Sequence, residues 1–246
     1  FLFFAYPAYM SGDKAWVVKP SWYYPQGDVE YITQATPLGD LANTAYNGTS
    51  PYVSDLTGYS WSEMFLGFVP GSIGETSTLC VLIGALFLIA TGIGSWRTMI
   101  GCVVGMLFMT LTLNHIVGPL FVQENAFLFV TPHWHFVIGS FAFATVFMAT
   151  DPVSSAHTDR GRYYYGFLIG FMGVLIRVLN PAYPEGMMLA VLFANGFAPL
   201  IDYYVVKANI LRRQTKSLKT TKDVLSPEPE NIKSATPGQV DGVEVS

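Results

Sequence analysis

The chain has 246 residues, of which 51% are hydrophobic and 12% are charged, and its formal net charge at pH 7 is −4. A soluble domain has roughly a quarter of its residues charged. The composition therefore excludes an ordinary soluble domain and indicates a membrane protein, and no nucleic-acid partner is expected.

The N-terminal sequence Phe1-Leu2-Phe3-Phe4-Ala5-Tyr6-Pro7 is apolar but has no basic n-region and no cleavage site. These features exclude a secretory signal peptide. We expect residues 1–10 to be the end of a truncated transmembrane helix, so that the chain is a fragment of a longer protein. Residues 11–77 follow as a long loop with many aromatic residues.

Five apolar stretches follow this loop, at residues 76–96, 98–123, 125–150, 163–179 and 186–206. A helix needs roughly 20 apolar residues to cross a bilayer. Arg177 and Asp202 are the only charged residues within these stretches. We therefore predict an all-α membrane protein, a polytopic bundle with five complete transmembrane helices across residues 78–206.

The distribution of basic residues predicts the orientation of the bundle, because Lys and Arg gather in cytoplasmic loops. If the basic segment that begins at Lys207 is cytoplasmic, alternation places Arg97, Arg160 and Arg162 on the same side. The loop of residues 11–77 is then external. Residues 207–246 are expected to be a basic cytoplasmic segment that ends in a disordered tail rich in Ser, Pro and Glu.

Two pairs of small residues have the spacing that lets transmembrane helices approach closely, Gly101–Gly105 and Gly166–Gly170. The stretches around them, "SWRTMIGCVVG" and "GRYYYGFLIG", are weakly similar and have the same predicted direction, which suggests an internal repeat. Before the first apolar stretch, Ser72 and Glu75 have the spacing of a capping box.

Candidate chemical groups are few, and no Walker loop, paired CxxC or HExxH motif is present. His133 and His135 are spaced for one metal only if their backbone is extended, and an interfacial position explains them equally well. Charged groups near membrane depth are functional candidates by default. These groups are Glu75, Asp151, Arg177, Glu185 and Asp202, and a carboxylate from a neighbouring helix is the expected partner of Arg177.

Four stretches, "FLFFAYPA", "GSIGETSTL", "FMATDPVS" and "NPAYPEGMMLAVLFAN", resemble sequence blocks of one family in the family's order. This family contains the B subunit of the sodium-translocating NADH:quinone oxidoreductase and its paralogue, the D subunit of the Rnf electron-transport complex. The resemblance extends from residue 1 to about Arg213, and "NPAYPEGMMLA" and "FLFFAYPA" favour the sodium pump.

The resemblance implies that a threonine in an external loop carries FMN through a phosphoester bond made by a flavin transferase. Thr36, in the sequence Glu30-Tyr31-Ile32-Thr33-Gln34-Ala35-Thr36, stands at the acceptor position. Glu30 replaces the usual Asp, and Gln34 replaces the usual Gly. Glycine permits backbone angles that a residue with a side chain resists. An ordinary turn is the alternative for this loop. Its aromatic residues, among them Tyr59 and Trp61, are candidates for stacking on the flavin.

The resemblance further implies a multi-pass subunit of a complex in the bacterial inner membrane that passes electrons from NADH toward ubiquinone and exports sodium. Riboflavin and a quinone site are implied without assignable residues. Asp202 and Asp151 are candidate sodium ligands, because carboxylate oxygens suit a hard cation. The alternatives are an Rnf-type subunit of an ion-translocating ferredoxin:NAD oxidoreductase and a flavin-free helical permease.

Overall fold

The computed structural model describes residues 36–45, 53–72, 74–117, 128, 130–179 and 185–225. These residues form helices and connecting turns, with no strand among them. The predicted helix end at residues 1–10 and the tail after residue 225 lie outside them. The chain divides into two compact units, residues 1–205 and 206–246.

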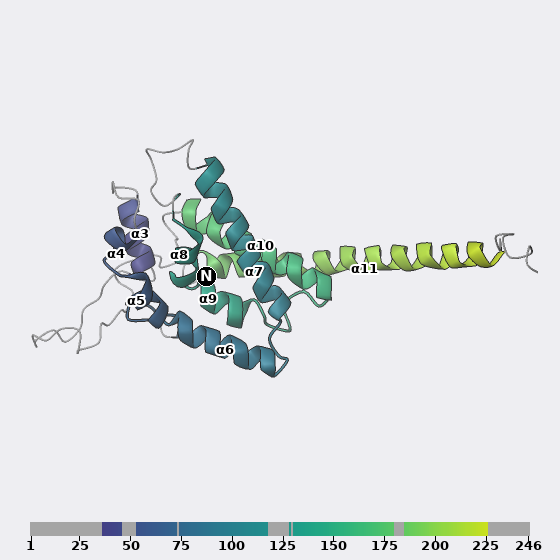
Figure 1. The fold of residues 1–246 in the computed structure, drawn as a ribbon, viewed down its shortest axis with the longest axis horizontal. Helices are drawn as coiled ribbons and strands as arrows, with labels where there is room; N and C mark the ends of the chain where they lie inside the picture. Colours follow the sequence, from purple (N-terminus) through teal and green to yellow (C-terminus); the bar gives the residue numbers. More distant parts are fainter. Residues whose placement is uncertain are drawn as a thin grey trace, which may run out of the picture. The chain divides into compact units, whose positions relative to one another are not determined.

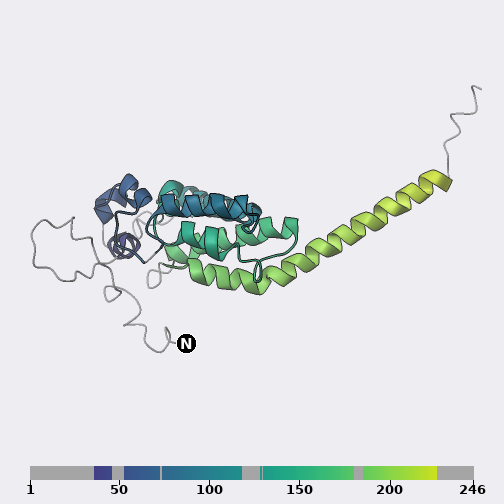
Figure 2. The same cartoon turned by 90° about the horizontal axis from the view of Figure 1, so that it is seen from below.

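Figure 1 shows the helices, which follow one another as α3 (Pro37–Ala45), α4 (Val53–Thr57), α5 (Trp61–Leu66), α6 (Thr78–Ala90), α7 (Trp96–Thr112), α8 (Pro132–Val137), α9 (Phe141–Phe143), α10 (Asp159–Leu179) and α11 (Met187–Leu225). Short π-helical segments continue α7 over Leu113–Val117 and α9 over Ala144–Met148. Helices α3, α4 and α5 cluster at one end of the first unit in both ribbon views (Figures 1 and 2).

Helices α7 and α10 pack side by side and run in the same direction. A β-carbon on Gly105 would collide with the carbonyl oxygen of Phe167, and one on Gly170 would collide with that of Cys102. The two backbones therefore touch where the sequence has its small-residue pairs, as predicted. The weakly similar stretches thus form two parallel helices that pack through their glycines.

Helix α11 packs against α10 in the opposite direction. The Tyr165 hydroxyl near the start of α10 donates to the side-chain oxygen of Asn195, and the Met187 sulfur lies against Gly173. The apolar core between the helices includes Met106, Phe141, Tyr165, Ile169, Val174, Val178 and Val191.

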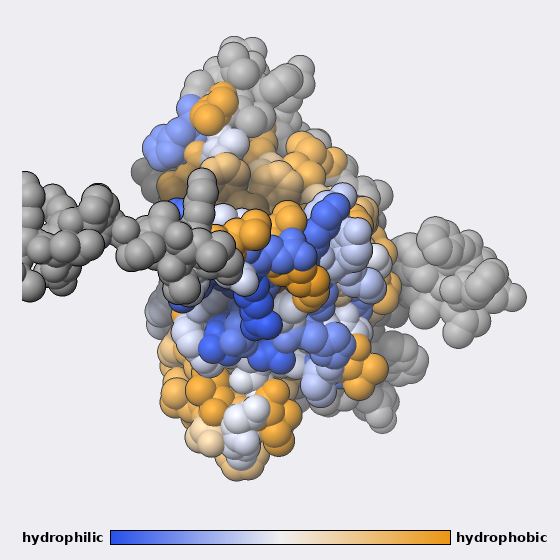
Figure 3. All heavy atoms as spheres, turned by 90° about the vertical axis from the view of Figure 1, so that its right-hand side faces the viewer, coloured by the Kyte–Doolittle hydropathy of each residue, from blue (hydrophilic) through white to orange (hydrophobic). Residues whose placement is uncertain are grey.

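Three helices of the described residues are long and apolar enough to cross a membrane: Trp96–Ile116, Asp159–Leu179 and Met187–Thr220. Large apolar side chains remain exposed on them, which is typical of surfaces that face lipid rather than water. Figure 3 shows that hydrophobic side chains form part of the molecular surface.

The prediction of five complete spans is not confirmed. Helix α6 has only 13 residues, and the stretch 125–150 is not one helix, because α8 ends at an extended residue, Ile138, followed by Gly139 with φ +65°. An apolar composition does not reveal such a break, since Ile, Gly and Ser are all compatible with a span. Irregular backbone at membrane depth is tolerated where it is buried in protein or lines a cavity.

The second unit begins at Val206, and its described residues continue α11 as a helix to Leu225. The side chains of residues 206–220 are all exposed. Among them are the basic residues Lys207, Arg212, Arg213, Lys216 and Lys219.

Candidate functional site

Thr36 stands at the N-terminus of helix α3. The backbone N–H of Gly39 donates to the Thr36 hydroxyl oxygen at 3.1 Å, and that of Asp40 donates to the Thr36 carbonyl at 2.9 Å. Threonine is a good N-cap, and proline, here Pro37, is favoured at the first helical position. The sequence Thr-Pro-Leu-Gly-Asp therefore begins a helix, and the predicted flavin acceptor is its cap.

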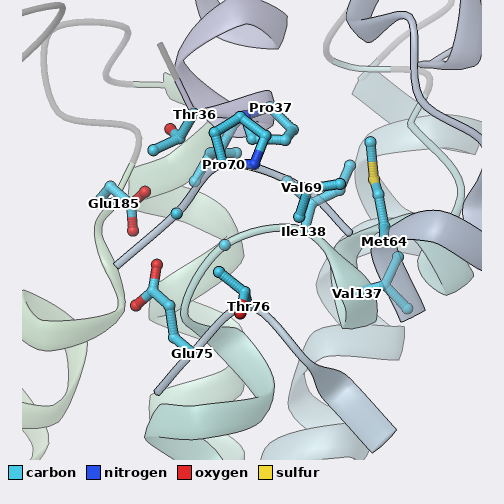
Figure 4. Close-up of a pocket in the computed structure, with 13 residues that line it drawn as sticks. Thr36, Pro37, Met64, Val69, Pro70, Glu75, Thr76, Val137, Ile138 and Glu185 are labelled. Carbon is cyan, nitrogen blue, oxygen red and sulfur yellow. The ribbon is translucent and has the colours of Figure 1, made fainter. Parts of the chain in front are cut away.

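A shallow pocket, partly open to solvent, lies beside Thr36 (Figure 4). Its apolar wall comes from α5, from the turn before α6 and from α8, through Met64, Val69, Pro70, Val137 and Ile138. Its polar lining includes Thr36, Glu75, Thr76 and Glu185. A mostly apolar wall with a few polar groups is typical of small-molecule sites.

Gly139, at the break after α8, shapes one wall of this pocket. A β-carbon at this position would lie 2.7 Å from Cδ2 of Leu38, which is 1% exposed in the first turn of α3. Its positive φ also favours glycine. The break therefore gives α3 a place to dock and brings Thr36 to the pocket.

Two carboxylates, Glu75 and Glu185, point toward each other across the pocket (Figure 4). Burial raises the pKa of Glu75 to about 7, the negative charge of Glu185 adds to this effect, and the positive charge of Arg177 opposes it. Burial also raises the pKa of Glu185, against the attraction of Arg177 and a hydrogen bond from the Ser140 hydroxyl at 3.4 Å. The pair therefore holds a proton near neutral pH more readily than ordinary glutamates do.

Arg177, in the last turn of α10, is 1% exposed and lies behind this wall. Its Nη1 donates to the carbonyl oxygen of His135 at 3.1 Å, whereas Nε and Nη2 have no hydrogen-bond acceptor among the described residues. No carboxylate of these residues lies within ion-pair distance of it, so the expected ion pair is not formed there. A β-carbon on Gly139 would lie 3.4 Å from Arg177 Nη2 and 3.8 Å from an oxygen of Glu185.

The predicted capping box of Ser72 and Glu75 is wrong. Ser77 caps α6 instead, accepting from the Cys80 N–H at 3.3 Å, so Glu75 is free to face the pocket. A capping box does occur at the start of α5, between Ser60 and Glu63. The Ser-x-x-Glu spacing there was the signal that could have identified it.

The two histidines proposed as metal ligands do not form a pair. Their backbone is helical, so residues two apart point in different directions. His135 is 2% exposed, while His133 is exposed with its ring nitrogen 3.1 Å from the Thr131 hydroxyl. No cluster of three or more potential metal ligands occurs in the part of the chain that the structure describes.

Of the aromatic residues suggested as flavin stacking partners, the structure describes only Tyr59 and Trp61. Trp61 stacks on Phe65 with ring centres 5.1 Å apart, and its indole N–H donates to the His133 carbonyl. Neither lines the pocket. The other aromatic residues suggested lie outside the described residues.

Asp202, in helix α11, lies beside the start of α10, at the opposite end of that helix from Arg177. Its carboxylate accepts from the backbone N–H groups of His157 at 2.7 Å and Thr158 at 3.0 Å, and from the Thr158 hydroxyl. Asp151 accepts from the N–H and hydroxyl of Ser154, at 3.0 and 2.6 Å, and these bonds lower its pKa. Both carboxylates thus bind the loop that leads into α10.

The pocket and the Asp202 cluster are separated by the length of α10. Asp202 meets the residues just before α10, whereas Arg177 lies in its last turn. A helix of 21 residues is about 30 Å long. The two candidate sites therefore lie at opposite ends of the bundle.

We predict that Glu75→Gln stabilises the protein at alkaline pH. The pKa of this carboxyl rises from 4.5 to about 7 on folding. The free energy of unfolding of the protein therefore falls as pH rises through that window, by about 1.4 kcal/mol per pKa unit at most. The apparent melting temperature of the variant in detergent should exceed that of the wild type at pH 8, and the difference should shrink toward pH 5.

Glu63→Gln is the matched control, for which we expect a change in melting temperature of the opposite sign. Hydrogen bonds from Ser60 lower the pKa of Glu63. The ionised Glu63 therefore stabilises the folded protein above pH 4.5, and this stabilisation is lost at lower pH. This variant should melt below the wild type at pH 8. An equal gain for both variants, or no pH dependence for Glu75→Gln, would show that the surroundings of Glu75 do not oppose its ionisation.

The chain is similar to known proteins over most of its length. Residues 1–211 match the family model described as the NQR2, RnfD, RnfE family. Proteins named as the B subunit of the Na(+)-translocating NADH-quinone reductase are similar: that of Chromohalobacter salexigens is 50% identical over 216 residues, and that of Klebsiella pneumoniae strain 342 is 49% identical over 218. That of Neisseria meningitidis serogroup B is 47% identical over 217 residues.

Each alignment covers 88% of this chain and 48 or 49% of the relative. The chain therefore spans about half the length of the curated relatives it matches. Because the family model covers most of the chain, the chain belongs to the NQR2, RnfD, RnfE family.

Proposed function

We propose that this chain is part of a membrane subunit of a redox-driven sodium pump, which passes electrons from NADH toward ubiquinone through FMN bound covalently to Thr36. The observation that carries the proposal is the position of Thr36, at a helix N-terminus beside a partly apolar pocket. Family membership and the names of the relatives support the same function.

The residues around Thr36 fit FMN chemically. A phosphate on the Thr36 oxygen would stand at the N-terminus of α3, where backbone N–H groups and the helix dipole favour negative charge. The apolar residues Met64, Val69 and Ile138 offer a surface for a flat ring. Attachment forms a bond between Oγ1 and phosphorus, breaks the bond from phosphorus to the leaving group of the flavin donor, and releases the hydroxyl proton.

Bound FMN supplies the electron chemistry, while the protein fixes its position. Thr36 holds the phosphate at one point, and the wall formed by α5 and α8 keeps water from one side of the pocket. A flavin transferase and the other subunits of the complex are the proposed protein partners.

We propose that sodium is exported through the bundle, with Asp202 and Asp151 as oxygen ligands. An ionised carboxylate has about four lone-pair sites, and three donors occupy part of those on Asp202. The cost of moving one positive charge outward is about 2.3 kcal/mol per 100 mV. The redox reaction must supply this free energy.

We place the subunit in the bacterial inner membrane as a multi-pass protein, with Thr36 external. The apolar helices support the membrane position. The family model also includes Rnf subunits, so identifying the neighbouring subunits in a purified complex tests the sodium-pump assignment against the Rnf-type alternative. The other alternative, a flavin-free helical permease, would have no FMN on Thr36.

The proposed attachment predicts that mass spectrometry finds one FMN on the peptide that contains Thr36, after expression together with a flavin transferase. Thr36→Asn should abolish this mass increase because an amide cannot form the phosphoester. Asparagine is as good an N-cap as threonine, so α3 should remain folded.

Two controls separate the hydroxyl from the helix. Thr36→Val should lose both FMN and the cap, which is worth about 1 kcal/mol. Thr44→Val, on the same helix, should keep FMN. If Thr36→Asn still carries FMN, another residue is the acceptor and the proposed role of Thr36 is wrong.

The second prediction concerns sodium. In the intact complex, Asp202→Asn should raise several-fold the sodium concentration that gives half-maximal NADH:quinone turnover, because one anionic ligand is lost. Asp159→Asn is the matched control, since Asp159 lies at the same end of the bundle and pairs with Arg97 at 3.0 Å.

Thr158→Val removes the hydroxyl that donates to Asp202 and accepts from the Gly161 N–H, without changing charge. It should leave the sodium dependence unchanged. An unchanged dependence in Asp202→Asn would remove this residue from the ion path.

A further inference from the structure

The guanidinium group of Arg177 lacks partners that its position requires. The side chain is 1% exposed, and only Nη1 has an acceptor, the carbonyl of His135. Nε and Nη2 donate to no atom of the described residues. A buried donor without an acceptor costs about 1–3 kcal/mol, and more when it is charged. A group with free acceptors is therefore expected next to Arg177.

The described carboxylates near Arg177 do not fill this role. Glu75 and Glu185 are close enough for their charges to affect Arg177, but neither lies within ion-pair distance. The Glu185 carboxylate accepts instead from the Ser140 hydroxyl.

The free side of Arg177 faces the wall against which α3 docks. The space next to Gly139 where a β-carbon would lie is 3.4 Å from Arg177 Nη2 and 2.7 Å from Cδ2 of Leu38. Leu38 follows Thr36 by two residues, and Thr36 and Gly139 line the same pocket. Arg177 does not line this pocket itself, and Gly139 lies between its Nη2 and the pocket that Thr36 lines.

We propose that Arg177 binds the phosphate of the flavin attached to Thr36 through Nε and Nη2, at the N-terminus of α3. This inference rests on the proposed attachment of FMN to Thr36. Two adjacent guanidinium N–H groups match two oxygens of a phosphate, and such charge-assisted pairs are stronger than neutral hydrogen bonds. The phosphodiester keeps one negative charge, which neutralises the buried guanidinium.

The two glutamates are compatible with a phosphate in this place. Burial and their mutual repulsion favour a proton on the pair near neutral pH. A protonated carboxyl donates a hydrogen bond instead of repelling the phosphate.

The test is a double-mutant cycle in the intact complex, expressed with a flavin transferase. It combines Thr36 or Thr36→Asn with Arg177 or Arg177→Gln. Mass spectrometry first measures FMN on the Thr36 peptide, and the apparent melting temperature is then measured for each form. We expect loss of FMN to lower the melting temperature clearly when Arg177 is present, and by less than half as much in Arg177→Gln.

The fluorescence anisotropy of the bound flavin gives a second readout. It should fall in Arg177→Gln while FMN stays attached, because the tether loses its second contact. If Arg177→Gln fails to fold, Arg177→Lys replaces it. Lysine keeps the charge but not the paired donors, so the anisotropy should still fall.

Glu185→Gln is the control for an indirect effect. It removes a negative charge beside Arg177 and should leave the stabilisation by FMN intact. If Glu185→Gln abolishes this stabilisation as Arg177→Gln does, Arg177 acts through the carboxylate and the proposal is overturned.

The outcomes also separate the two proposals. A wild-type chain without FMN on Thr36 would overturn both. A wild-type chain with FMN, but with equal loss of stability in both Arg177 backgrounds and unchanged anisotropy, would overturn the role of Arg177 alone.

Discussion

The break in the chain between α8 and α9 is the constraint on which the candidate site depends. Gly139 takes a left-handed conformation that a side chain resists, and its missing β-carbon makes room for Leu38. Were residues 125–150 one straight helix, this wall would present side chains where α3 now docks. Thr36 would then have no pocket of this form beside it.

The packing of α7 against α10 gives this site a firm support. Their glycines bring two parallel backbones into contact, and α10 carries Arg177 at one end while Asp202 meets the other. The same helix therefore joins the proposed flavin site to the proposed sodium ligands.

Some of these features could be predicted from the sequence and others could not. The helical class and the close approach at Gly101–Gly105 and Gly166–Gly170 followed from residue type and spacing. The break at Gly139 did not, because an apolar stretch with one glycine is also compatible with a continuous span. The facing of Glu75 and Glu185 depends on tertiary contacts between residues 110 positions apart, which no local pattern encodes.

The most direct test of this account is the sidedness of the two ends of α10. Single cysteines at Ser62, in the helix that lines the pocket, and at His157, beside Asp202, are exposed positions for labelling. With Cys80 replaced by serine, a membrane-impermeant maleimide should label Ser62→Cys in intact cells and His157→Cys only after the membrane is opened. Labelling of His157→Cys from outside, or of Ser62→Cys only from inside, would contradict an external flavin site.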